Sequence, residues 1–250
     1  MRCIRTVSEA EVIAEFLKNE FYQEEFHRDR ERFEDLVLKA NTRDDIENTL
    51  RRALLFRRRG HLWREVPRDT EWTEVELTAA ELENLRVFPR AQWRKVANGS
   101  FRAGDIVERI RSRSVSGRVA DFIAKIHSLN YRLRCEPVSD AIILIGVNQK
   151  EPFTVIEGNH RLTAALMTSP NLAQRRFRFY LGLSPRMTES CWYVTNLATL
   201  ARYAKNRFRH FWYDSEADVD RLLRRLTRNG QPELARVAGA EKAFPESFHK

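Results

Sequence analysis

A strand-to-helix junction at residues 153–167 holds the side chains best suited to chemistry. It consists of a short apolar run, a polar turn and the start of a helical pattern. The first amides of a helix lack internal partners and lie at its positive end, so such a junction favours anions. Gly158 permits a backbone conformation and a close ligand approach that a side chain would forbid, and Asn159 suits the helix N-cap. Arg161 offers a planar fork of donors for phosphate oxygens, which indicates a phosphate-handling turn.

Two further side chains of the turn could move protons or hold a metal ion. His160, at the positive end of the helix, is expected to be neutral and able to exchange one proton near neutral pH. Glu157 ends the strand and could hold a divalent cation or act as a base. In a plainer interpretation Glu157 pairs with Arg161 four residues later, His160 is solvated, and the turn only starts a helix. We favour a ligand site because the polar residues concentrate in one turn before an apolar helix.

The turn resembles the signature of a known superfamily. Glu157 and the following residues 158–161 resemble the Gly-x-His-Arg or Gly-x-Arg-Arg turn of the ParB/sulfiredoxin-like superfamily, in which the turn binds nucleotide phosphates. The superfamily includes sulfiredoxins using ATP, chromosome-partitioning proteins using CTP, and free-serine kinases with an Asp-Gly-His-His-Arg turn. The resemblance covers residues 72–185 and implies a nucleoside di- or triphosphate, ATP or ADP, with Mg²⁺ at Glu157. The residues expected to contact this nucleotide are Gly158, Asn159, His160 and Arg161.

The chain also departs from these families. Sulfiredoxins carry a reactive Cys directly before the His, where this chain has Asn159, so sulfinic acid reduction is not expected. No recognisable helix-turn-helix segment follows the turn, which weakens the assignment to a full partitioning protein. The turn is closest in chemistry to that of the kinases, with Glu157 in the place of the kinase Asp.

Two functions of different classes follow from these residues. The first is a nucleotide-dependent phosphotransferase acting on a small hydroxyl-bearing substrate, with Arg161 and the helix amides holding phosphate. In this hypothesis Glu157 holds Mg²⁺ or acts as the base, and His160 assists proton transfer. The alternative is a nucleotide-switched DNA-binding or nuclease-like protein of the ParB type. A protein that keeps the fold without chemistry is a third interpretation, and the intact turn argues against it.

The elements around the turn predict an α+β fold, in which a small mixed β-sheet forms a ParB/sulfiredoxin-like core. Strand patterns occupy residues 71–77, 141–147, 153–157 and 177–183. The nearly continuous apolar run 141–147 predicts a central strand that is buried on both faces. Three regions are expected: a helical N-terminal region at 1–62, the nucleotide-binding core at 63–186, and a C-terminal helical region at 187–250 packed on the core.

Helical periodicity and capping signals predict most of the remaining elements. Ser8 and Glu11 form a capping box that begins the first helix. Pro170 is expected to end the helix that follows the turn. Further helices are expected around 33–37, over 42–55, over 105–126 in two pieces, over 187–212, and from Asp214 or Ser215 to Leu226.

Three groups of basic residues could contact phosphate, and each has a plainer interpretation that we favour. The first, Arg57–Arg59, is expected to be a solvated helix end. The second lies near 111–118 and is expected to belong to a mobile surface loop. The third, mixed with aromatic residues over 187–212, is expected to form a packing face that does not stack bases.

Composition limits the class of protein. The chain has 250 residues, of which 42% are hydrophobic and 32% charged, as in a folded globular protein. The longest apolar run is too short to cross a bilayer, and no apolar signal segment begins the sequence, so we expect a cytoplasmic protein without a membrane span. Three separated cysteines predict neither a zinc site nor a disulfide framework. The net charge of +9 attracts polyanions, but acidic residues are interleaved, so nucleic acid is not favoured as a partner.

Overall fold

A computed structural model describes residues 1–89, 91–112, 119–135, 140–150, 152–209 and 214–228. These residues group into two compact units, each described here by itself. Unit 1 comprises the described residues of Met1–Val7 and Val66–Leu200, and unit 2 those of Ser8–Glu65 and Ala201–Lys250. The expected boundaries at 62 and 186 remain predictions.

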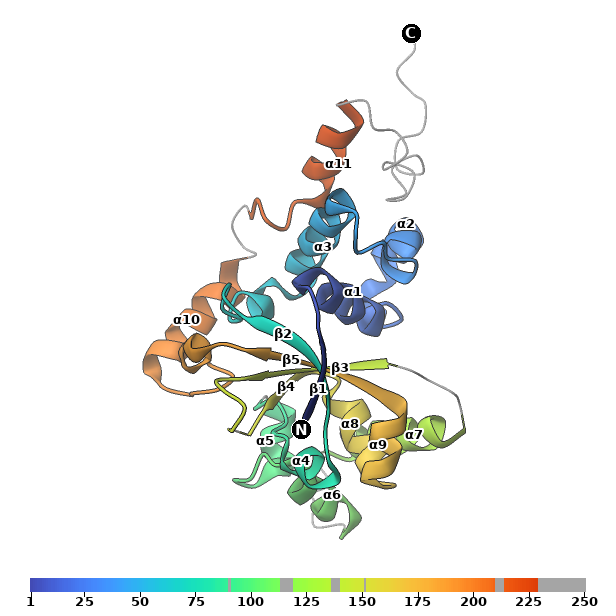
Figure 1. Cartoon of the computed structure of the whole chain (residues 1–250), viewed down its shortest axis with the longest axis vertical. Helices are drawn as coiled ribbons and strands as arrows, with labels where there is room; N and C mark the ends of the chain where they lie inside the picture. The colour runs from blue at the N-terminus through green and yellow to red at the C-terminus, as the bar shows by residue number, and fades with distance from the viewer. Residues whose placement is uncertain (90, 113–118, 136–139, 151, 210–213, 229–250) are drawn as a thin grey trace. The chain divides into compact units, whose positions relative to one another are not determined.

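The strands of unit 1 form one mixed sheet. In the described part of the chain its order is β1 (Arg2–Thr6), β2 (Glu71–Glu76), β5 (Phe177–Leu183), β3 (Asp140–Gly146) and β4 (Thr154–Glu157). Strands β3 and β5 pair in parallel, and all other neighbours pair antiparallel. The expected α+β class with a mixed sheet is therefore confirmed at this coarse level (Figure 1).

The central strand β3 lies between β5 and β4. Its residues from Ala141 to Gly146 are all buried, which confirms the predicted interior strand. The sheet continues past β4 through isolated bridges: Arg86 pairs with Thr154 in parallel and with Arg102 in the antiparallel sense. The extended segment around residue 86 therefore pairs with the β4 edge, and the segment around residue 102 pairs with it in turn. Without them the outer main-chain N–H and C=O groups of β4 would have no β-sheet partner.

Strand β1, which precedes the first predicted helix, was not expected in the region predicted to be helical. All five of its residues are exposed. Because the strand has no buried face, its sequence lacks the alternation of apolar and polar residues that would indicate a strand. Long-range pairing with β2 forms it instead, and Arg2–Glu76 and Arg5–Glu74 ion pairs follow that pairing. Charged side chains of this kind are common on edge strands, where they oppose pairing with a second chain.

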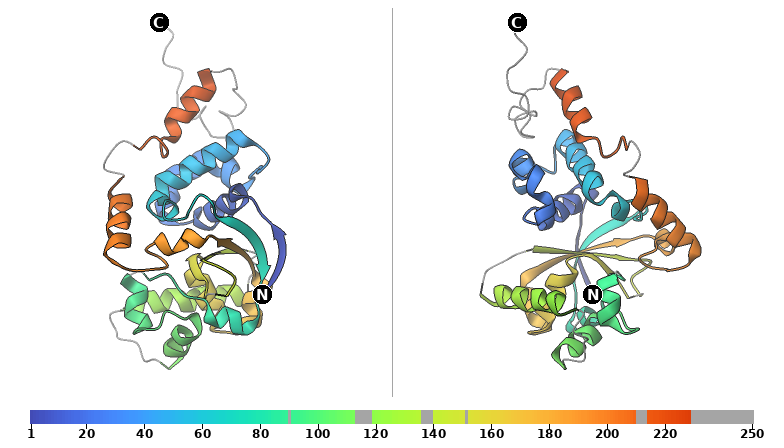
Figure 2. Two further views of the ribbon diagram at one scale, coloured as in Figure 1. Left: turned by 60° about the vertical axis from the view of Figure 1, so that its left-hand side comes forward. Right: turned by 180° about the vertical axis from the view of Figure 1, so that it is seen from behind.

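The helices of unit 1 that follow β2 gather on one face of the sheet (Figures 1 and 2). Their apolar faces meet β3 and β4 in one core, in which Ile142, Leu144 and Val155 are fully buried. Each such side chain contributes about 1.5 to 3 kcal/mol by leaving water. The helices are α4 (Ala79–Asn84), α5 (Ala91–Ala97), α6 (Ala103–Arg111), α7 (Ala120–Cys135), α8 (Asn159–Leu166) and α9 (Pro170–Arg176).

Unit 2 is helical throughout its described elements. The capping box of Ser8 and Glu11 begins α1 as predicted. The helices in chain order are α1 (Glu9–Glu20), the 3-10 helix η1 (Glu24–Phe26), α2 (His27–Leu38), α3 (Asp45–Trp63), α10 (Leu197–Phe208), whose first turn belongs to unit 1, and α11 (Val219–Arg228).

Two helix predictions were wrong at their ends. Pro170 does not end a helix but occupies the first turn of α9, where its missing amide costs nothing, and Ser169 caps that helix. The last helix begins at Val219 and not at Asp214 or Ser215.

The predicted helix over 187–212 is also interrupted. The 3-10 helix η3 covers Pro185–Glu189, and α10 begins only at Leu197. The side chains of Asn196 and Thr199 bind each other's main-chain amides at 2.9 and 3.0 Å, which starts α10 there. Residues 210–212 lie outside the described part.

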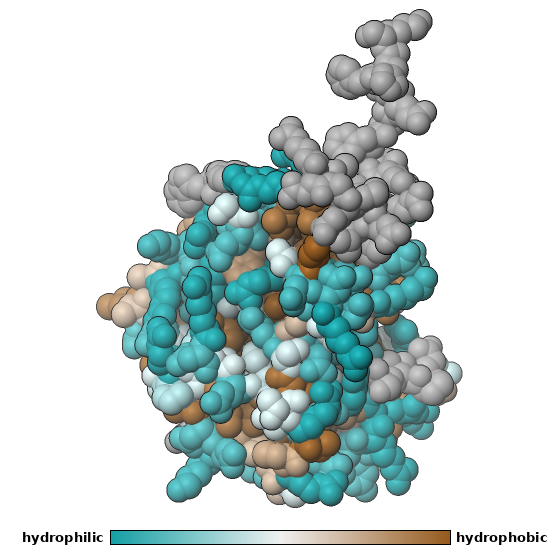
Figure 3. All heavy atoms as spheres, turned by 45° about the horizontal axis from the view of Figure 1, so that its top comes forward, coloured by the Kyte–Doolittle hydropathy of each residue, from teal (hydrophilic) through white to brown (hydrophobic). Residues whose placement is uncertain are grey.

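Among the described residues, no helix has both the length and the apolar character needed to cross a bilayer. The face of the molecule in Figure 3 is mostly hydrophilic, with small hydrophobic areas between the polar residues. This mixture fits a chain in which charged residues of both signs are interleaved.

Candidate functional site

The turn between β4 and α8 depends on glycine. Gly158 is the N-cap of α8 and has φ +96° and ψ 12°, in the left-handed region that side-chain-bearing residues avoid. A Cβ at this position would also lie 2.4 Å from Cδ1 of Ile142 on the neighbouring strand. The predicted need for a special backbone conformation is confirmed, and no side chain caps the start of α8.

Asn159 is not the N-cap, which corrects the sequence prediction. Its side chain is buried and accepts a hydrogen bond from the Phe88 amide at 2.8 Å, while its Nδ2 donates to the Val155 carbonyl at 3.2 Å. A long-range partner therefore uses the oxygen that was expected to cap the helix. The side chain of Asn159 fixes the segment before α5 against the turn.

Arg161 lies between two carboxylates. Its Nη1 is 2.8 Å from Oδ2 of Asp140, and its Nη2 is 3.1 Å from Oε1 of Glu157. Nη2 also donates to the Ala141 carbonyl at 3.3 Å. The Glu157–Arg161 pair that the plainer interpretation predicted is present, and Asp140 joins it. We call Glu157, Arg161 and Asp140 the acidic corner, because two negative charges surround one positive charge.

Asp140 was missed as a site residue, although the sequence contained a signal for it. The hairpin of β3 and β4 was predicted, and antiparallel pairing brings the first residues of one strand beside the last residues of the other. The register pairs Ile143 with Glu157, so Asp140 lies just past the end of β4. A charged residue at the start of an otherwise apolar strand, opposite another charged residue, is such a signal.

His160 is half-buried among aromatic rings, which corrects the solvated alternative. Its ring centroid lies 5.2 Å from that of Trp93 on α5 and 5.0 Å from that of Phe122 on α7. These two rings also form an edge-to-face pair at 4.8 Å. The sequence could not predict this cluster, because its members come from three separate helices.

The basic groups do not converge on the turn. Arg57 pairs with Asp29 and Asp220, and Arg59 pairs with Glu20, so Arg57–Arg59 is not the solvated helix end that we expected. These ion pairs lie within unit 2. The arginines therefore stabilise contacts among the unit 2 helices.

Arg111 and Trp192 also have structural partners. Arg111 donates to the Leu166 and Met167 carbonyls at 3.0 and 2.8 Å, at the end of α8, while Arg113 and Arg118 lie outside the described part. Trp192 is buried against Phe88, as the packing interpretation predicted, whereas Phe208 on α10 is exposed, so that interpretation is confirmed only in part.

The acidic corner suits a cation that arrives together with an anion. The described residues contain no group of three or more His, Cys, Asp or Glu side chains able to hold a metal ion alone. Mg²⁺, however, needs only one or two carboxylates when phosphate oxygens and water complete its coordination. Glu157 and Asp140 supply two carboxylates beside the start of a helix, so the donor set fits Mg²⁺ bound with a nucleotide.

Comparison of the chain with protein-family models, curated proteins and solved structures finds no match.

Proposed function

We propose that the acidic corner binds the phosphates of a nucleoside di- or triphosphate together with Mg²⁺, and that the protein transfers a phosphoryl group to a small hydroxyl-bearing substrate. The observation that carries this proposal is the cluster of Asp140, Glu157 and Arg161, joined at 2.8 and 3.1 Å beside the start of α8. Phosphoryl transfer needs little more than positioning and charge stabilisation, which such a cluster can supply. The resemblance of residues 157–161 to the kinase turn supports the same reaction class.

Each residue of the corner has a role in this proposal. Arg161 offers a planar fork of donors to phosphate oxygens, and its pairs with Asp140 and Glu157 use part of these donors and keep the guanidinium in place. Glu157 holds Mg²⁺ or accepts the proton of the substrate hydroxyl, and Asp140 orients Arg161. His160, at the start of α8, assists proton transfer or neutralises charge on the substrate. When bound, Mg²⁺ would neutralise charge on the phosphate oxygens, with Glu157 and Asp140 as its carboxylates.

A thermal-shift screen with ATP, ADP, CTP and GTP, each with and without Mg²⁺, tests nucleotide binding. Selective stabilisation by one nucleotide with Mg²⁺ is expected, because a ligand that binds only the folded state raises its melting temperature. The Glu157→Gln variant should keep that shift and lose turnover with a panel of small alcohols and hydroxy acids. No shift with any nucleotide, or full turnover by Glu157→Gln, would contradict the proposal.

The alternative function, nucleotide-switched DNA binding or a nuclease-like activity, predicts affinity for duplex DNA that falls steeply with salt. The ion pairs of Arg57 and Arg59 do not favour it, because these side chains are already neutralised by acidic partners. Binding of duplex DNA that a nucleotide strengthens would replace the phosphotransferase proposal with this one.

A further inference from the structure

Unit 1 contains a cavity at the other end of β4, beside the segments around residues 86 and 102. Its volume is about 650 Å³, which suits a small ligand. It lies where β4 begins, whereas the acidic corner lies where β4 ends. Its lining combines Leu85, Phe101, Pro152 and Phe153 with Glu81, Asn84, Arg86, Gly99, Ser100, Arg102, Gln149 and Lys150.

Main-chain hydrogen bonds fix the wall that carries the two arginines. The Arg86 amide donates to the Phe153 carbonyl at 2.8 Å, and the Arg86 carbonyl accepts from the Val155 amide at 2.8 Å. On the other side, the Ala103 amide donates to the Leu85 carbonyl at 2.7 Å. These bonds involve no side-chain charge, so the wall does not need its arginine side chains in order to form.

Three cations line this cavity without a carboxylate partner among the described residues. Arg86 and Arg102 face each other across a bridge, and like charges at paired positions repel. No ion pair within the described part of the chain includes Arg86, Arg102 or Lys150. Arg102 instead donates to the neutral Oδ1 of Asn84.

Among the described residues, two carboxylates near the cavity have partners other than these three cations. Glu81 forms an ion pair with the N-terminal ammonium of Met1. Burial alone would raise the pKa of Glu81, but hydrogen bonds from that ammonium and from Thr78 lower it overall. The Glu81 carboxylate is therefore negatively charged and paired with the N-terminal ammonium. Asp105, three residues after Arg102, accepts a hydrogen bond from Ser100. The cavity therefore keeps a positive excess.

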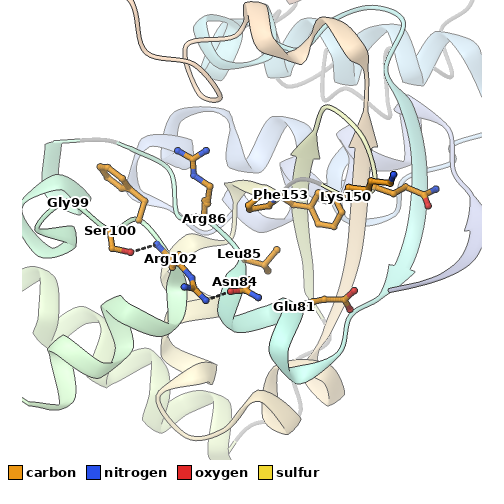
Figure 4. A pocket seen from close by; sticks show the side chains of 12 residues that line it. Glu81, Asn84, Leu85, Arg86, Gly99, Ser100, Arg102, Lys150 and Phe153 are labelled. Atoms are coloured by element: carbon orange, nitrogen blue, oxygen red, sulfur yellow. Dashed lines mark hydrogen bonds between the residues drawn. The ribbon is translucent and has the colours of Figure 1, made fainter.

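The cations are arranged on both sides of an apolar floor. Figure 4 shows Arg86 and Arg102 on one side of Phe153 and Leu85, with the guanidinium of Arg102 directed at Asn84 and that of Arg86 pointing the opposite way, and Lys150 on the other side. A short molecule with an anionic group at each end could neutralise both sides while its middle covers the ring of Phe153.

We propose that this cavity binds a small organic dianion, with one anionic group at Arg86, the other at Lys150, and its apolar middle over Phe153. This site is separate from the acidic corner and does not depend on the proposed phosphotransfer. Gly99 has φ +97° and would leave open space around a Cβ, so the rim near it gives the ligand room to enter.

Isothermal titration calorimetry of the full chain with glutarate and with adipate tests this site, and inorganic phosphate serves as the one-ended comparison. At least one dianion should bind with a Kd of about 1 mM or tighter, and phosphate should bind more weakly. Arg86→Gln and Lys150→Gln should each weaken the dianion about tenfold or more, because each removes one end of the contact. Lys125→Gln and Arg134→Gln, exposed positions on α7, are matched controls and should bind as the wild type.

The Arg161→Gln variant separates the two proposals, because it should bind the dianion normally while nucleotide binding at the corner is weakened. If neither dianion binds at a concentration of about 1 mM, the inference is overturned. Equal binding by the pocket variants and the controls, or equal affinity for phosphate and the dianions, would overturn it too. Tighter binding of a single-stranded oligonucleotide, lost in the same variants, would mean that the cavity recognises a nucleic-acid backbone.

Discussion

Two Glu–Arg pairs with the same spacing of four residues differ in what surrounds them. In unit 2, Arg51 on α3 is fully buried and lies 2.7 Å from Glu47. Its other contacts are neutral: the Leu36 and Asn41 carbonyls at 3.2 and 2.7 Å, and Oδ1 of Asn48 at 2.6 Å. One positive charge there meets one negative charge.

In unit 1, the Glu157–Arg161 pair has the same spacing but a second carboxylate, Asp140. It also lies beside a left-handed glycine, where no side chain caps the helix. The comparison shows that the spacing of a Glu–Arg pair does not by itself distinguish a structural pair from a candidate site. The net charge of the cluster and the backbone beside it make the distinction.

The largest difference should appear when each arginine is removed. Arg51→Met leaves Glu47 buried without its partner, and we expect the free energy of unfolding to fall by about 3 to 5 kcal/mol. Arg161→Met should cost no more than about 1 to 2 kcal/mol, since its carboxylates can gain water. Urea denaturation monitored by circular dichroism measures both values. Equal losses would mean that the two pairs have the same structural role.

The glycine turn should give a smaller, separable effect. Gly158→Ala carries a left-handed backbone cost of about 1 to 2 kcal/mol and a contact with Ile142. Gly99→Ala is a matched control, because Gly99 has nearly the same φ of +97° but nothing within 4 Å of an added Cβ. Gly158→Ala should therefore be the more destabilising of the two in urea. If the two variants lose the same amount, the contact with β3 does not constrain the turn.

The smallest effect concerns Asp220, whose carboxylate pairs with Arg32 and Arg57 in unit 2. Burial alone would raise the pKa of Asp220, but hydrogen bonds and charge contacts from Arg32 and Arg57 lower it overall. A carboxylate with a lowered pKa in the folded state stabilises above its unfolded pKa and loses this contribution as the pH falls through the folded pKa. Melting temperatures of the wild type should therefore fall more between about pH 5 and pH 3 than those of Asp220→Asn. We expect this contribution to be below about 1 kcal/mol. If the melting temperatures of the two proteins fall in parallel with pH, Asp220 makes no such contribution.

The sequence predicted those parts of the structure that depend on local patterns. The apolar run of β3, the capping box at Ser8 and the glycine of the turn each have a signal within a few residues, and the structure has all three features. The sheet order, by contrast, could not be predicted, because β1 has no buried face.

The same limit applies to the candidate site. Long-range partners decided the roles of its side chains: the Phe88 amide binds Asn159, Trp93 and Phe122 surround His160, and Asp140 joins Arg161. Only Asp140 could have been found from the predicted hairpin. Phe88 lies in the segment before α5, and Trp93 and Phe122 lie on α5 and α7, all far from the turn along the chain, so no local pattern reveals them.

The central claim is that the acidic corner binds nucleotide phosphates through Arg161. Isothermal titration calorimetry with ATP and Mg²⁺ tests it most directly, on the wild type, on Arg161→Gln and on Arg134→Gln as the exposed arginine control. We predict saturable binding that Arg161→Gln weakens about tenfold or more, as expected for the loss of a charge-assisted phosphate contact, and that Arg134→Gln leaves unchanged. Undiminished binding by Arg161→Gln, or no binding by the wild type to ATP or to the other nucleotides of the screen, would contradict the claim.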